Sequence, residues 1–209
     1  MIKYFLFWIG SFIRVTRVSR VCEYIKRAYN YIYTGYIRKG FKAWGEGTLI
    51  LPYAMNIKGE DAISIGSNTQ LGKSIQLTAW KRYQDKEYQP TISIGDNCLI
   101  RDFAHITAIN KIIIGNNLLT GTNVLITDNS HGFLSKDSVE VNPSKRDLFS
   151  SGPVYIGNNV WLGNNVTILP NVSIGNGVII GANSVVTKDI PDNCVAAGVP
   201  AKVVKRLEL

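Results

Sequence analysis

The two histidines of this sequence are its side chains best suited to proton transfer near neutral pH. They are His105, in the segment RDFAHITAIN, and His131, in the segment ITDNSHG. An unperturbed imidazole has a pKa near 6.5, so it can accept the proton of an attacking hydroxyl group. Such a general base accelerates a reaction by about 10²–10⁴-fold. Base catalysis by one imidazole is therefore the simplest chemistry that this sequence offers.

The other reactive residue types point away from metal and disulfide chemistry. The three cysteines, Cys22, Cys98 and Cys194, lie far apart and show neither a disulfide framework nor metal-ligand spacing, which favours a reducing compartment. Two histidines are too few for a three-histidine zinc site, so no metal is expected. No run of eighteen apolar residues occurs, and the apolar stretch 4–13 is too short to span a bilayer and has no clear cleavage site. We expect a cytoplasmic protein, with a peripheral position at the inner face of the membrane as an option.

The positive charge of the chain is concentrated at its N-terminus. Residues 1–42 contain nine Lys and Arg against one acid, Glu23, which accounts for the formal net charge of +8. The same segment is dense in Tyr, Phe, Trp and Ile, and it reads as one or two amphipathic helices. These helices could cap the open end of the main body or pack on a neighbouring subunit, or they could lie on an anionic membrane surface.

A six-residue repeat dominates the rest of the chain. Apolar residues recur every six positions from Ile156 to Val186, and shorter series begin at Ile65, Ile94 and Ile114. Helices repeat at 3.6 residues and strands at 2, so a period of six indicates short flat faces joined by regular corners. Each face places one side chain inward, and stacked coils form one continuous core. The sequence therefore predicts an all-β fold, a parallel β-helix.

The residues at fixed positions after each inward side chain support these corners. Glycine directly follows most inward positions, as at Gly66, Gly95 and Gly157, and Asn or Gly lies three residues after them, as at Asn68 and Gly177. Asn and Gly tolerate a positive φ better than other residues do, so a repeated corner selects them.

Two insertions interrupt the repeat and define the expected organisation. The segments 78–91 and 127–153 are polar loops that extend from corners of the predicted β-helix, and long loops of this kind are often functional. We expect a basic N-terminal segment at 1–42, a β-helix over 43–198 that carries both loops, and a basic C-terminal tail at 199–209.

Two stretches resemble a known family. They are IIIGNNLLTGTNVLITDNSHG and VYIGNNVWLGNNVTILPNVSIGNGVIIGANSVVTKDIPDNCVAAGVPAKVVKRL, in which VVTKDIP followed by GVPAKVV is the most specific part. They resemble the hexapeptide-repeat acyltransferases, within the maltose, galactoside and nodulation-factor O-acetyltransferase group, over roughly residues 92–207. The N-terminal forty residues look more like the leaders of capsule and exopolysaccharide acetyltransferases. The resemblance implies a left-handed β-helix that assembles as a homotrimer with active sites between subunits.

The resemblance also implies a reaction and residues for it. The reaction is transfer of an acetyl group from acetyl-CoA to a hydroxyl of a sugar or polysaccharide, with His131 as general base. A backbone N–H could stabilise the oxyanion. Residues that match cofactor positions of the family are Trp161, Asn164, Ala182, Thr187, Lys188, Lys202 and Lys205. Lys202 and Lys205 stand where relatives often have Arg. Lysine keeps the positive charge that attracts the phosphates but cannot form the two parallel hydrogen bonds of a guanidinium group.

Three further residues are candidates for contact with the acceptor. His105 could help bind an acceptor at a subunit boundary or be a structural histidine. Asp128 could orient the ring of His131 or cap the turn, and Asp102 is a third candidate.

Other functions remain open from the sequence. A sugar N-acetyltransferase or a streptogramin-type acetyltransferase would have a similar base and cofactor site, and a β-helix without catalysis could serve as a scaffold. Nucleic-acid binding is not expected, because the positive charge is confined to an aromatic-rich leader that contains no known recognition module.

Overall fold

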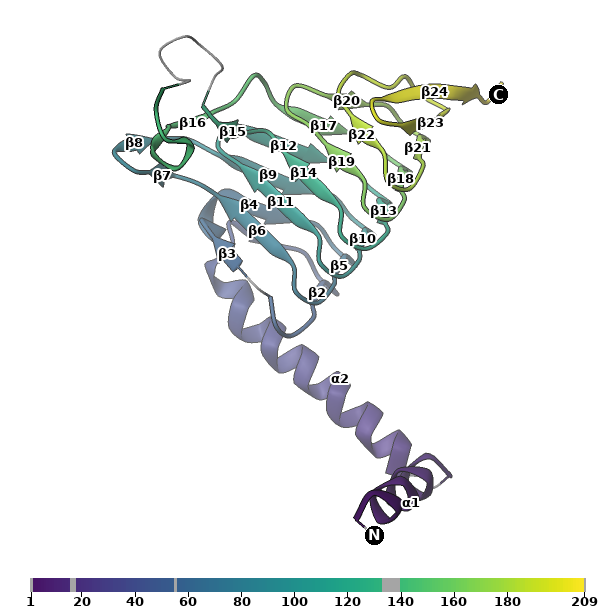
Figure 1. Cartoon of the computed structure of the whole chain (residues 1–209). Coiled ribbons are helices and arrows are strands. Elements are labelled where there is room, and N and C mark those ends of the chain that lie inside the picture. Colours follow the sequence, from purple (N-terminus) through teal and green to yellow (C-terminus); the bar gives the residue numbers. More distant parts are fainter. Residues whose placement is uncertain (1, 16–17, 55, 133–139, 209) are drawn as a thin grey trace.

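The protein is a three-sided β-helix with a helical arm at its N-terminal end (Figure 1). The computed structural model describes residues 2–15, 18–54, 56–132 and 140–208. Helix α1 (Ile2–Val15) and helix α2 (Val18–Ile37) form the arm, and the short 3₁₀ turn η1 (Arg38–Gly40) leads into the first coil. Two further 3₁₀ turns, η2 (Glu60–Ala62) and η3 (Pro143–Lys145), lie in connections between strands.

Three sheets form the sides of the prism, and successive coils pair in parallel. Sheet A contains β1 (Ala43–Trp44), β4 (Ile63–Ile65), β9 (Thr91–Ile94), β12 (Lys111–Ile114), β17 (Val154–Ile156) and β20 (Ser173–Ile174). Sheet B contains β2 (Leu49–Ile50), β5 (Gln70–Leu71), β10 (Leu99–Ile100), β13 (Leu119–Thr120), β18 (Trp161–Leu162), β21 (Ile179–Ile180), β23 (Cys194–Gly198) and β24 (Ala201–Arg206). Sheet C contains β3 (Asn56–Lys58), β6 (Gln76–Ala79), β11 (His105–Ala108), β14 (Leu125–Thr127), β19 (Thr167–Ile168) and β22 (Val185–Val186).

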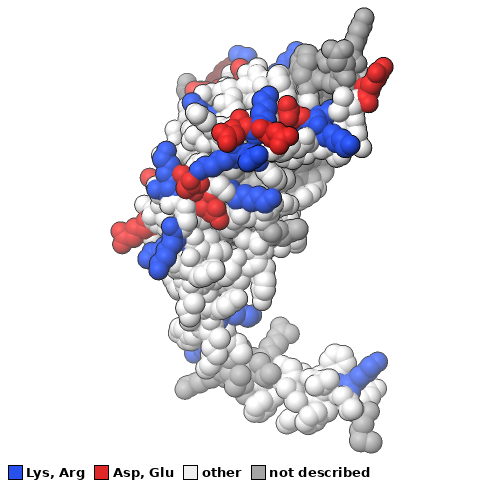
Figure 2. Space-filling model, turned by 90° about the vertical axis from the view of Figure 1, so that its left-hand side faces the viewer, with Lys and Arg blue, Asp and Glu red and all other residues white. Residues whose placement is uncertain are grey.

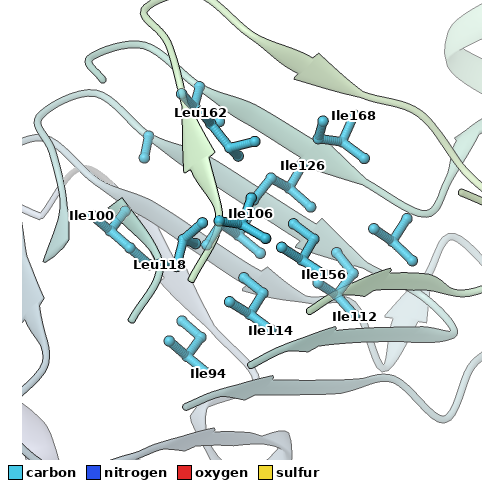
Figure 3. Close-up of a cluster of buried hydrophobic side chains, with 14 of the residues drawn as sticks. Ile94, Ile100, Ile106, Ile112, Ile114, Leu118, Ile126, Ile156, Leu162 and Ile168 are labelled. Atoms are coloured by element: carbon cyan, nitrogen blue, oxygen red, sulfur yellow. The ribbon is translucent and has the colours of Figure 1, made fainter. Parts of the chain in front are cut away.

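The core is a stack of aliphatic side chains, and its register confirms the six-residue repeat. Every predicted inward position is buried, from Ile65 and Leu71 in the early coils to Ile180 and Val186 in the late ones. Figure 3 shows the middle of this stack, where residues from all three sheets point toward one another. Full burial of such a side chain contributes about 1.5–3 kcal/mol. The repeat thus supplies a rigid body without any large helical layer.

The corners confirm one part of the Asn/Gly prediction and correct another. The predicted residues three positions after each inward side chain have a positive φ, for example Asn68 at 56° and Gly177 at 65°. The glycines directly after the inward positions do not have a positive φ. They are needed instead for close approach of the next coil, since a Cβ on Gly95 would lie 2.6 Å from the carbonyl carbon of Gly115. These positions require glycine because neighbouring coils come into close contact there, and not because of a positive φ.

A ladder of side-chain oxygens joins the corners of neighbouring coils. Oδ1 of Asp96 accepts a hydrogen bond from Ser67 N–H, Oδ1 of Asn116 accepts one from Asp96 N–H, and the same arrangement continues through Asn158 and Asn176. These bonds satisfy backbone donors that the flat faces leave unpaired at each corner. The prism is therefore tied along its edges as well as through its core.

Both ends of the prism are covered. At the N-terminal end, the hydroxyl of Thr34 in α2 donates to the carbonyl of Ile50 over 3.2 Å and accepts from Ile50 N–H over 3.1 Å. At the C-terminal end, β24 pairs antiparallel with β23 and completes sheet B. Most of the expected tail at 199–209 is therefore a strand of the prism. None of the helices in the described part of the chain has the length and apolar character needed to cross a bilayer.

Candidate active site

His131 lies on a short strand of the second insertion, beside the outer face of sheet C. The chain leaves sheet C after β14, and β15 (Ser130–His131) then pairs antiparallel with β16 (Leu148–Phe149), with His131 opposite Leu148. The imidazole is exposed, and the ring of Tyr83 packs edge-on against it with 5.6 Å between ring centroids. An exposed imidazole held by a neighbouring ring can receive a proton from a bound molecule.

Asp128 anchors the start of this insertion from inside the protein. Its side chain has an exposed fraction of 0%. Oδ1 accepts from Ile109 N–H over 2.9 Å, Oδ2 accepts from Asn110 N–H over 2.9 Å, and the amide of Asn129 also donates to Oδ1. Burial raises the pKa of Asp128, although these hydrogen bonds act to lower it. Asp128 thus caps a turn, and it has no exposed surface for the expected contact with an acceptor.

His105 and His131 line the same hollow. This cavity, with a volume of about 340 Å³, lies on the outer face of sheet C. His105 is on β11, where its side chain points outward between Gln76 of β6 and Leu125 of β14. Burial lowers the pKa of His105, so the neutral imidazole is favoured. The structure therefore brings together the two residues best suited to proton transfer.

The first insertion forms a wall of the hollow and is tied to the second. Its hairpin pairs β7 (Arg82–Tyr83) with β8 (Lys86–Glu87). The amide of Gln84 donates to the Ser144 carbonyl over 2.9 Å, and the hydroxyl of Tyr88 donates to the Leu148 carbonyl over 2.9 Å. The segment that carries His131 is thereby bonded to a segment about sixty residues earlier in the sequence.

Sequence reasoning missed the aromatic residues of this wall and the polar floor. Trp80 and Tyr83 both line the hollow, and Gln76 lies beside His105 at its floor. Trp80 and Tyr83 are, together with Tyr88, the three aromatic residues of the mostly polar insertion 78–91, which was a usable signal. Gln76 carried no signal, because the same position of the repeat holds many residue types.

Asp102 lies apart from this hollow. Its Oδ1 accepts from Lys73 N–H over 2.8 Å, which is the corner interaction of the neighbouring coils. Asp102 is not among the described residues that line the cavity.

The expected cofactor residues lie on other parts of the prism. Trp161 is on the outer face of sheet B, where its side chain has an exposed fraction of 50%. Asn164 is exposed at the following corner, with its Oδ1 accepting from Thr122 N–H over 2.9 Å. The other five are exposed on the last coils or on β24: Ala182, Thr187, Lys188, Lys202 and Lys205. Within the described chain, none of these seven lines the hollow of His131.

Comparisons with known proteins agree with this architecture. Residues 153–188 match the family described as bacterial transferase hexapeptide (six repeats). The chain is 42% identical over 161 residues to a protein of Escherichia coli (strain K12) named lipopolysaccharide biosynthesis O-acetyl transferase WbbJ, an alignment that covers 75% of this chain and 78% of that protein. It is also 40% identical over 120 residues to the galactoside O-acetyltransferase of the same organism, with 57% of this chain and 56% of that one covered.

Solved structures show the same fold. An N-acyltransferase from Bacillus cereus, AntD, superposes with a TM-score of 0.64 at 22% identity, over 81% of this chain and 86% of that one. A galactoside acetyltransferase in complex with coenzyme A superposes with a TM-score of 0.53 at 28% identity, over 82% of this chain and 68% of that one. The chain belongs to the hexapeptide-repeat acetyltransferases, with their left-handed β-helix. It is an acyltransferase, and its acyl donor is acetyl-CoA.

Proposed function

We propose that His131 is the general base of an O-acetyltransferase that moves the acetyl group of acetyl-CoA to a hydroxyl of a sugar. The observation that carries this assignment is the position of His131, which is exposed beside a hollow large enough for a small molecule. Membership in a family whose relatives are named O-acetyltransferases supports the reaction, and the name of WbbJ adds a polysaccharide as the kind of acceptor.

The proposed reaction needs one proton carrier. His131 takes the hydroxyl proton as the acceptor oxygen attacks the carbonyl carbon of the thioester. A carbon–oxygen bond forms, the carbon–sulfur bond breaks, and the imidazolium returns the proton to the departing thiolate. Because Asp128 and Tyr83 hold the two sides of the segment that carries His131, the imidazole is positioned before the acceptor binds.

We further propose that acetyl-CoA lies along the last coils of the prism. The exposed backbone at the corners near Asn164 and Ala182 can bind an amide-rich arm as an added strand would. Lys202 and Lys205 are exposed on β24, where two cations can meet phosphate groups. Trp161, Thr187 and Lys188 are exposed near the same coils and complete the proposed surface for acetyl-CoA.

A homotrimer would join this surface to the base. Trp161 lies on sheet B, whereas the hollow with His131 lies on sheet C. One chain therefore holds the proposed base and the proposed cofactor surface on different sides, and a neighbouring copy could supply the missing half. Sedimentation velocity should give three times the 23.2 kDa chain mass. Mixing inactive His131→Asn subunits with inactive Trp161→Ala subunits should restore part of the activity, and no recovery after exchange would contradict a shared site.

The helical arm supports a peripheral contact with an anionic membrane. Large apolar side chains of α1 are exposed, including Phe5 at 61%, Phe7 at 73% and Trp8 at 65%. On the face that Figure 2 shows, basic but no acidic side chains appear on the arm, while acidic and basic side chains are mixed over the body. Aromatic and basic residues together suit an anionic bilayer surface. Full-length protein should sediment with phosphatidylglycerol vesicles, and the double variant Phe5→Ser, Phe7→Ser should not.

The decisive test of the proposed function is substitution of the base. His131→Asn should remain folded and lose about 10²–10⁴-fold in the rate constant for acetyl transfer, measured as thiol release in the presence of a sugar acceptor. The circular dichroism spectrum should not change, since the side chain is exposed. A near-normal rate in this variant would remove the assignment of His131.

A further inference from the structure

The floor of the hollow beside His131 is a row of uncharged polar side chains. Asn56, Gln76 and His105 lie on adjacent strands of sheet C and face each other in register. Adjacent strands are about 4.8 Å apart, so the three groups form an evenly spaced line. None of these three side chains makes a hydrogen bond within the residues that the structure describes. They are therefore available to a ligand, and each carries both donor and acceptor atoms.

Three threonines of sheet C also line the hollow. Thr78 and Thr107 lie two positions after Gln76 and His105 on their strands, Thr127 lies two positions after Leu125 on β14, and all three are buried. The hydroxyl of Thr78 donates to that of Thr107 over 2.8 Å, and the hydroxyl of Thr127 donates to the Asn129 carbonyl over 2.9 Å. These hydroxyls already have partners, so the floor row is the part of sheet C best able to make polar contacts with a ligand.

An aromatic wall leads from the rim of the hollow to His131. The ammonium group of Lys58 lies 4.3 Å from the ring centroid of Trp80. Trp80 packs edge-on against Tyr83 with 5.8 Å between centroids, and Tyr83 packs edge-on against His131. A ligand at the floor thus has apolar ring surface beside it and the proposed base at the end of the wall.

In the described part of the chain, charged side chains do not line the hollow itself, although the ammonium group of Lys58 lies over Trp80 at its rim. The described residues that line it include no Lys, Arg, Asp or Glu, and its two histidines are its only basic groups. Burial lowers the pKa of His105, which favours its neutral form. A nucleoside diphosphate carries phosphate groups that proteins bind with Arg, Lys or clustered N–H donors. The part of the site that this chain supplies therefore matches an uncharged, hydroxyl-rich molecule better than a phosphorylated one.

We infer that this hollow is the acceptor site and that it takes a neutral sugar residue of an oligosaccharide or polysaccharide, and not a nucleoside-diphosphate sugar. The inference rests on the proposed function. Gln76 and His105 hydrogen-bond the sugar hydroxyls, Trp80 and Tyr83 cover the sugar ring, and the hydroxyl to be acetylated points to His131.

The experiment compares acceptors and a matched pair of variants. Full-length enzyme is supplied with acetyl-CoA and with neutral mono- and oligosaccharides or the corresponding UDP-, GDP- and dTDP-sugars, and acetylated products are measured by mass spectrometry. Gln76→Ala is compared with Gln70→Ala, which removes the same side chain six residues earlier, from the outer face of sheet B. Gln76→Ala should raise the KM for the acceptor by about 2- to 10-fold, the loss expected for one neutral hydrogen bond, with the KM for acetyl-CoA unchanged. Gln70→Ala should match the unaltered enzyme.

The outcomes separate this inference from the proposed function. Efficient transfer to nucleoside-diphosphate sugars, or equal acceptor KM values for the two glutamine variants, would overturn the inference while acetyl transfer by His131 stands. Binding is measured independently by calorimetric titration of the same sugars into His131→Asn. Neutral sugars that bind this variant, with binding weakened when Trp80→Ala is added, support the site. If no neutral sugar binds, the acceptor site lies elsewhere.

Discussion

Asp128 offers a test of how the prism holds the loop that carries His131, the proposed base. The carboxylate is fully buried, and each of its two oxygens accepts a backbone N–H, from Ile109 and from Asn110. Asp128→Asn replaces one acceptor oxygen by an NH₂ group that faces a buried donor. The unsatisfied buried donor costs about 1–3 kcal/mol, and removal of the buried charge offsets part of this cost, so we expect a loss of about 1–2 kcal/mol in the free energy of unfolding at pH 7.

The chain supplies a matched control for this substitution. Asp96 uses only one oxygen, Oδ1, to accept from Ser67 N–H at an exposed corner. Asn116 and Asn158 perform the same task in the next coils, so Asp96→Asn should change stability by less than about 0.5 kcal/mol. Both variants are unfolded in urea at one fixed protein concentration. If the losses in unfolding free energy caused by Asp128→Asn and Asp96→Asn differ by less than about 0.5 kcal/mol, the two hydrogen bonds to Asp128 are not what holds the loop.

Three further predictions concern Asp128, Tyr83 and two glycines. Burial raises the pKa of Asp128 above its ordinary value of 3.8, so the folded state binds the proton more tightly than the unfolded state does. The resulting stability is present at low pH and is lost as the pH rises from 3.8 through the raised pKa of the folded state. Asp128→Asn should therefore flatten this part of a plot of urea midpoint against pH. Tyr83→Ala should lower kcat by about 2- to 10-fold by removing the ring beside His131, whereas Tyr83→Phe should keep it, in steady-state assays. Gly95→Ala should cost about 1–3 kcal/mol of stability through overlap with the next coil, and Gly35→Ala, which has open space in α2, should add about 0.5–1 kcal/mol in the same urea assay.

The repeat could be predicted from sequence because each coil repeats the same physical requirement. An inward apolar side chain, a glycine at the point of contact and a residue with positive φ recur at fixed intervals, and the structure has buried side chains and positive φ values where these intervals place them. The cause assigned to the glycines was wrong, since pattern alone does not distinguish a strained φ from a crowded Cβ. Only the distances between coils separate the two.

The site could be predicted only in part, because it depends on contacts between segments far apart in sequence. His131 carries its own signal, because it is one of two histidines in the sequence and lies in an insertion that interrupts the repeat. The sequence left two roles open for Asp128, orientation of the His131 ring or capping of a turn, and the bonds from the turn after β11 to its carboxylate favour the cap. Gln76 gave no signal, because only the stacking of β6 on β11 makes it a neighbour of His105.

Both insertions leave the prism at the same edge, and this placement explains how one rigid scaffold can carry a specific site. The first leaves after β6 and the second after β14, both on the way from sheet C to sheet A, while the coil between them passes from β11 to β12 through the short turn at Ile109 and Asn110. Asp128 bonds to that short turn, and the first hairpin bonds to the second insertion. The coil between the insertions therefore sets the position of His131 along the prism, and the insertions set the shape of the wall. Exchange of residues in 78–91 should alter which acceptor is used before it alters the chemistry at His131.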